Sequence, residues 1–139
     1  MPREDAVAKG DDRRLGAREE FLRGIDAFNA GRWFDCHETM EELWVGAAGE
    51  LRDLYQGILQ VAVALHHWQN GNYPGTMLLL ASGEKLLRRV EPWCLGVDVT
   101  ALIAAGEGLR GALEALGEER MAELDRALIP SILVQHRAR

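Results

Sequence analysis

The chain has 139 residues, of which 47% are hydrophobic and 27% are charged, and its formal net charge is −6. This length and composition are typical of one soluble globular domain with a single hydrophobic core. The acidic balance argues against a nucleic-acid partner, because binding to phosphates requires clustered cations.

Further features indicate a cytoplasmic protein without a membrane partner. The longest apolar segment, residues 54–68, contains two Gln and two His and is shorter than the ~20 apolar residues that span a bilayer. The N-terminus lacks the apolar run of a secretion signal. Cys36 and Cys94 form no Cys-x-x-Cys pair, so we expect reduced, buried thiols.

The first 30 residues divide into a charged segment and a helix. Residues 1–16 carry both signs of charge and few apolar side chains, which predicts a flexible N-terminal tail before a single helical domain over 17–139. Apolar residues then recur at intervals of three and four, which predicts a helix over 17–30. Gly31 is suited to end this helix, because glycine adopts the left-handed conformation without strain.

The second predicted helix, residues 33–46, has polar residues within its apolar face. His37 and Glu41 lie one turn apart, among the apolar residues of that face. A charged side chain on a buried face is costly unless it has a partner, so Glu41 requires a hydrogen bond, an ion pair, a metal or its own proton. Glu38 is intermediate between the two faces.

The third predicted helix, about residues 50–70, is apolar in nearly every direction. Such a helix is typically buried, which makes it the centre of the fold. Its polar residues Gln56, Gln60 and His67 fall close together on the helical wheel, where they form one polar stripe.

The remaining chain predicts two long helices and a C-terminal segment. Asn72 or Tyr73 caps a helix that has Pro74 in its first turn and ends before Pro92. Asp98 is a suitable N-cap for the next helix. A short charged helix over 118–127 and an extended or one-turn segment over 128–134 follow, and the sequence leaves open the role of residues 118–139.

Two similar turns indicate how these helices are connected. The sequences Gly31-Arg32-Trp33 and Gly71-Asn72-Tyr73 lie 40 residues apart, each between two predicted helices. They imply two antiparallel helical hairpins. The predicted fold is therefore all-α, a compact bundle of five to six helices around the central helix.

The polar residues of the second and third helices predict a small binding site. If these helices pack antiparallel, His37, Glu41 and His67 meet between them. Two imidazoles and one carboxylate with open positions are the ligand set of a mononuclear iron or zinc site, so a divalent metal is the candidate cofactor. The residues expected to line the same pocket are Gln56, Gln60, Glu38, Trp33 and Trp44.

Two other interpretations remain open. The polar cluster is also explained by a structural hydrogen-bond network that binds nothing. The two hairpins are alternatively a helical interaction module, whose partner would be another protein or a second copy of the chain. No nucleophile elbow or phosphate-binding glycine loop is present, and no pattern predicts a particular reaction.

Several stretches resemble a known family. They are Phe28–Glu38 (FNAGRWFDCHE) with Glu41 and Trp44, Gln56–Gln60 (QGILQ) with Ala62 and Ala64, His67 with Gly71, Asn72 and Gly75, and Gly96–Val99 (GVDV). Together they resemble the prokaryotic family catalogued as domain of unknown function 309, over about residues 21–99. The resemblance implies a small all-helical intracellular domain and brings no established reaction, substrate or cofactor.

The family's shared positions include the residues that the helical wheels select, namely His37, Glu41, Gln56, Gln60 and His67. Thr76 departs from the family, which often has Ala at this position. The segment beyond about Gly117 lies outside the resemblance.

Overall fold

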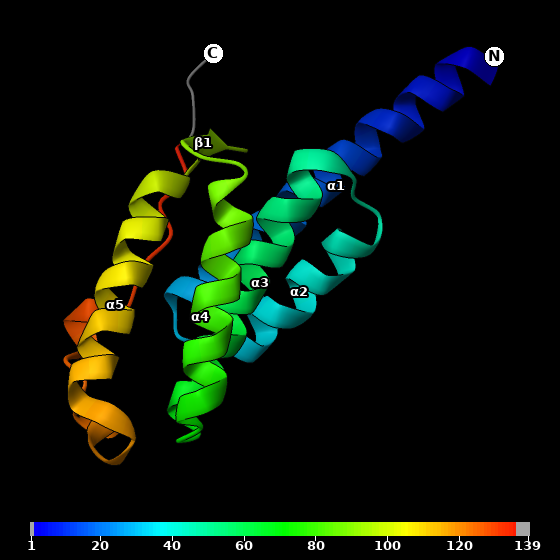
Figure 1. Cartoon of the computed structure of the whole chain (residues 1–139). Coiled ribbons are helices and arrows are strands. Elements are labelled where there is room, and N and C mark those ends of the chain that lie inside the picture. Colours follow the sequence, from blue (N-terminus) through cyan, green and yellow to red (C-terminus); the bar gives the residue numbers. More distant parts are fainter. Residues whose placement is uncertain (1, 136–139) are drawn as a thin grey trace.

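The structure, a computed structural model, describes residues 2–135, with side chains described from residue 16 onward. Its five α-helices are α1 (Pro2–Asn29), α2 (Trp33–Val45), α3 (Gly49–Gln69), α4 (Tyr73–Arg88) and α5 (Val99–Arg120), as Figure 1 shows. A small antiparallel hairpin of β1 (Trp93–Cys94) and β2 (Val97–Asp98) connects α4 to α5. The predicted all-α bundle is confirmed.

Helix α3 is the centre of the bundle. It packs against α2 and α4, while α1 packs on α2 and α5 packs on α4. Leu54, Ile58, Ala62 and Leu65 of α3 are completely buried. Helix α3 is therefore the buried central helix that its apolar sequence predicts. No helix within the described residues is both long and apolar enough to cross a lipid bilayer.

The two predicted hairpins form through turns with the same backbone geometry. Gly31 and Gly71 have φ angles of 80° and 75°, which glycine adopts without steric penalty. The N–H of Arg32 donates to the carbonyl of Ala27 at 2.8 Å, and the N–H of Asn72 donates to the carbonyl of His67 at the same distance. These bonds close a Schellman motif at the end of α1 and of α3.

Glycines permit the close approach of α3 and α4. A methyl group at Gly57 would lie 2.8 Å from Cγ of Leu87, and one at Gly83 would lie 3.2 Å from the carbonyl oxygen of Gly57. The two helices thus pack almost backbone against backbone at this point.

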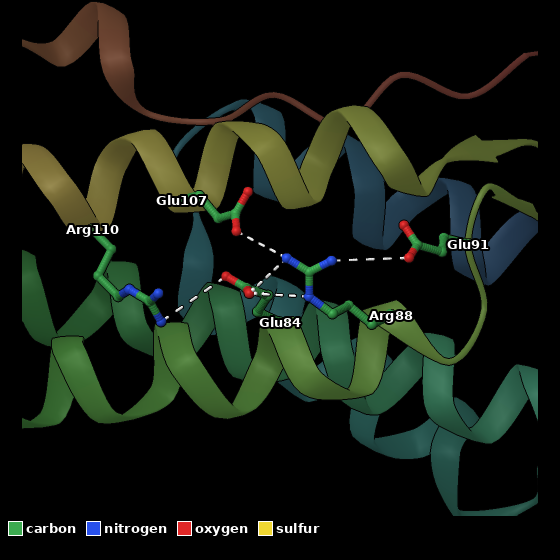
Figure 2. A network of polar contacts seen from close by, with 5 residues as sticks. All are labelled: Glu84, Arg88, Glu91, Glu107 and Arg110. Atoms are coloured by element: carbon green, nitrogen blue, oxygen red, sulfur yellow. Dashed lines mark hydrogen bonds and ion pairs between the residues drawn. The ribbon is translucent and has the colours of Figure 1, made fainter.

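The contact between α4 and α5 includes a network of charged residues (Figure 2). The Arg88 guanidinium lies 3.0 Å from a carboxylate oxygen of Glu84 and 2.9 Å from one of Glu107 on α5. Arg110 of α5 reaches Glu84 at 4.0 Å, and Arg88 reaches Glu91 at the same distance. The network is largely exposed, so we expect it to orient the helices more than to stabilise them.

The predicted start of the first helix is wrong. Helix α1 begins at Pro2, so residues 2–16 have helical backbone, and Figure 1 shows this part extending beyond the other helices. Arg3, Ala6, Ala8, Arg13 and Arg14 favour a helix there even without an apolar face. Mobility of this segment stays a prediction.

The predicted helix over 118–127 begins at the expected place but is shorter. The backbone of α5 is not helical at Gly117 (φ 78°, ψ 175°), so α5 consists of two helices joined at this kink, and the second ends at Arg120. Two 3-10 turns follow, η1 (Met121–Glu123) and η2 (Arg126–Leu128).

The C-terminal segment is extended, as predicted. Ile132 is buried, and Val134 forms a β-bridge with Val97. The side chain of Asn29, at the end of α1, accepts from the N–H of Ile132 at 2.7 Å and donates to its carbonyl at 2.9 Å. The end of the described chain is thereby attached to both the first helix and the β-hairpin.

Candidate functional site

The three predicted metal ligands do not gather at one point. Among the described residues, no group of three or more His, Cys, Asp or Glu side chains is placed to hold a metal ion. Helices α2 and α3 are neighbours, as the prediction requires. The side chains of His37, Glu41 and His67 nevertheless have different surroundings.

The polar stripe of α3 contacts α4 instead of α2. The hydroxyl of Ser82 on α4 donates to Oε1 of Gln60. Nδ1 of His67 lies 3.2 Å from Nδ2 of Asn72, at the start of α4. Gln56 is half-buried. Gln60 and His67 therefore stabilise the α3–α4 hairpin and do not complete a site on α2.

The buried face of α2 is rotated away from its acidic residues. Trp33, Cys36 and Met40 are its buried residues, and Glu38 and Glu41 are exposed. The expected cost of burying Glu41 thus does not arise, because its carboxylate remains in water. Trp44 is half-buried, and the guanidinium carbon of Arg52 lies 3.9 Å from its ring centroid. This cation–π contact covers the Trp44 ring near the end of α2.

A different cleft lies between α2 and α3. It has a volume of about 110 Å³ and is lined by Trp33, Phe34, His37, Val63 and His66. The ring centroid of Phe34 lies 5.7 Å from the ring centroid of each imidazole, His37 and His66. Of the eight predicted site residues, only Trp33 and His37 line this cleft.

His37, which lines the cleft, has an unusual polar atom. Its Nδ1 is buried and has no hydrogen-bond partner among the described residues. An unpartnered buried polar group costs about 1–3 kcal/mol, so such atoms are uncommon in folded proteins. His66 is tied to its own helix, since its Nε2 lies 3.2 Å from Nδ2 of Asn70. The residues that line the cleft thus combine apolar walls with two buried polar atoms that have no partner in the described chain, Nδ1 of His37 and Nε1 of Trp33.

The sequence prediction missed Phe34, Val63 and His66. His66 and His67 are adjacent, and consecutive helical residues point about 100° apart. Because α3 has neighbours on two sides, a polar stripe on it does not show which neighbour it contacts. Val63 and His66 lie one turn apart on α3, so their spacing does show that they share a face of the helix. This spacing is common to many helices and does not by itself indicate a cleft.

Comparison with known proteins identifies relatives of this chain. It is 34% identical over 95 residues to the uncharacterized protein YpuF of Bacillus subtilis (strain 168), a match that covers 64% of this chain and 53% of YpuF. It is 36% identical over 47 residues to an uncharacterized protein of Aquifex aeolicus (strain VF5), covering 33% of this chain and 14% of that protein. The matched region thus spans about half of YpuF and a smaller part of the Aquifex protein.

A family model matches the part of the chain that forms the two hairpins. The match covers residues 21–79, from within α1 to within α4, and includes every residue that lines the cleft. It begins at Phe21, where the sequence resemblance was expected to begin, and ends before the predicted landmark Gly96–Val99. The predicted resemblance is therefore confirmed: residues 21–79 match the family described as Domain of unknown function (DUF309).

Proposed function

We propose that this protein binds a small planar molecule in the cleft between α2 and α3. The observation that carries the proposal is the buried Nδ1 of His37, which has no hydrogen-bond partner among the described residues and belongs to a side chain that lines a largely apolar cleft. Small-molecule sites typically combine apolar walls with a few polar groups that fix orientation. Here His37 is that group.

The size and chemistry of the cleft define the ligand class. A volume of about 110 Å³ is smaller than that of a drug-sized site and suits a single aromatic ring. The rings of Trp33 and Phe34 and the side chain of Val63 provide the apolar contact. The ligand is thus a six-membered ring, or a group of similar size, with one hydroxyl or amine that pairs with His37.

Phenol and toluene test the proposal, because they have the same size and differ in one polar group. The affinity of each is measured by NMR titration, following the Val63 methyl groups and the ring nitrogens of His37. We expect both to shift the cleft signals and phenol to bind about threefold to tenfold more tightly, as one hydrogen bond predicts.

Matched variants locate the preference. His37→Leu removes the polar atom from the cleft, and His67→Leu makes the same change at an imidazole outside it. The preference for phenol should disappear in His37→Leu and persist in His67→Leu, with the fold of each variant checked by circular dichroism. Equal affinity of phenol and toluene for the unmodified protein, or a preference that survives His37→Leu, would refute the proposal.

A further inference from the structure

A second cavity lies on another part of the bundle. It has a volume of about 280 Å³ and is formed by the α1–α2 turn and the C-terminal segment over 126–131. Gly31 and Trp33 line it from the turn, and Arg126, Pro130 and Ser131 line it from the segment. No Asp or Glu lines this cavity within the described part of the chain, although the protein has a net charge of −6.

Trp33 lines this cavity and carries a buried hydrogen-bond donor without a partner in the chain as described. It is only 5% exposed, and its Nε1 has no partner among residues 16–135. A methyl group at Gly31 would lie 4.0 Å from Cζ2 of Trp33, on the edge of the indole that carries Nε1. This edge therefore faces the turn that forms the cavity wall. The neighbouring Trp68 differs, because its Nε1 donates to the carbonyl of Met121 at 2.9 Å.

Arg126 supplies a cation at the same cavity. Its guanidinium carbon lies 5.2 Å from the ring centroid of Trp68, which is within the range of a cation–π contact. Trp68 in turn packs edge-on against Trp33, with ring centroids 6.4 Å apart. A stacked guanidinium keeps its N–H donors in the ring plane, where they are available to a ligand. Arg126 thus contacts Trp68, which packs on Trp33, and Arg126 and Trp33 both line the cavity.

We propose that this cavity binds a small molecule through an oxyanion, a carboxylate or phosphate group. The N–H of Trp33, the guanidinium of Arg126 and the hydroxyl of Ser131 are the donors, and charge-assisted bonds of this kind are the strongest available to an anion. The apolar body of the ligand packs on Phe28, Ile129 and Pro130. Asn29 also lines the cavity, and hydrogen bonds to the N–H and the carbonyl of Ile132 fix the position of its amide.

Benzoate and phenyl phosphate test this proposal, with benzyl alcohol as the neutral probe. Each is titrated into the full chain while the indole N–H signal of Trp33, assigned with Trp33→Phe, and the amide signal of Ser131 are followed by NMR. We expect saturable shifts of both signals with at least one anion, and much weaker shifts with benzyl alcohol. The stronger of the two anions identifies the carboxylate or the phosphate as the preferred group.

Charge variants make the test specific. Arg126→Gln should weaken binding of that anion by about tenfold or more, as loss of a charge-assisted bond predicts. Arg120→Gln is the matched control, because Arg120 pairs with Glu123 and does not line the cavity. Its affinity should change less than about twofold. His37→Leu should leave the affinity unchanged, which separates this site from the cleft between α2 and α3.

The proposal is overturned if neither anion produces saturable shifts, or if Arg126→Gln and Arg120→Gln bind the anion equally well. Shifts that are as large for benzyl alcohol as for both anions would also overturn it, because they would show an apolar cavity without anion recognition.

Discussion

At the scale of single residues, the thiol of Cys36 is the titratable group most changed by folding. Its side chain is completely buried on α2, and this burial raises its pKa from 9.0 to about 12. Burial also raises the pKa values of Cys94 and Tyr55. All three groups are held in their neutral forms, since a charge in the apolar interior would be poorly solvated.

These pKa values predict that alkaline pH destabilises the protein. Because the pKa of Cys36 is higher in the folded state, the thiol ionises first in the unfolded chain as the pH rises. The free energy of unfolding is therefore unaffected by this thiol below about pH 9 and decreases as the pH rises towards 12. We expect the urea midpoint to fall steadily above pH 9 in unfolding curves followed by tryptophan fluorescence.

Cys36→Ala isolates the contribution of this thiol. The variant should be less stable at neutral pH because it leaves a small cavity, but its midpoint should fall less steeply above pH 9. If the two proteins lost stability in parallel over the alkaline range, Cys36 would not be responsible.

At the scale of elements, the α3–α4 contact depends on the absence of a side chain at Gly57. Alanine favours a helix over glycine by about 0.5–1 kcal/mol, so Gly57→Ala would stabilise a solvent-exposed helix. In this structure the new methyl group overlaps Cγ and Cδ2 of Leu87 at 2.8 Å. The steric effect should win, because Leu87 is buried and has no free space to move into.

We therefore expect Gly57→Ala to lower the free energy of unfolding by about 1–3 kcal/mol. Gly111→Ala is the matched control, because a methyl group there meets no atom within 4 Å. This second variant should be more stable than the parent by up to about 1 kcal/mol. Urea unfolding of both proteins gives the comparison, and an increase in stability for Gly57→Ala would show that the helices separate easily.

At the scale of the whole molecule, the C-terminal segment joins the two ends of the described fold. The bonds between Asn29 and Ile132 connect residues 103 positions apart, and Gln135 donates its N–H to the carbonyl of Gly96 at 2.7 Å. The segment also forms one wall of the second cavity. Its position thus determines whether that cavity exists.

Asn29→Ala should release this segment. The variant leaves the N–H and the carbonyl of Ile132 without their partners, which predicts a loss of about 1–3 kcal/mol and faster hydrogen exchange over residues 129–135. Gln69→Ala is the control, because Gln69 occupies the same position at the second turn, 40 residues later, and is exposed. Amide exchange measured by mass spectrometry should change in the first variant only; unchanged exchange in Asn29→Ala would show that other contacts hold the segment.

Much of the helical architecture could be predicted from the sequence, because the signals for it are local. Gly31 and Gly71 end helices at the expected places, and Asn72 and Asp98 cap α4 and α5 with side-chain hydrogen bonds. The start of α1 could not be predicted from an apolar pattern, since residues 2–16 have none. The predicted interaction with a protein partner or a second copy stays a prediction.

The sequence by itself determined the helices, their turns and the central place of α3, because helix period, capping and burial are properties of neighbouring residues. Only the tertiary structure decided which polar residues meet. Gln60 and His67 contact α4, the rings of His37 and His66 both lie near Phe34, and Arg126 of η2 lines a cavity together with Trp33. Helix rotation and long-range packing set these contacts, and a rotation of one residue, about 100°, changes which neighbour a side chain contacts.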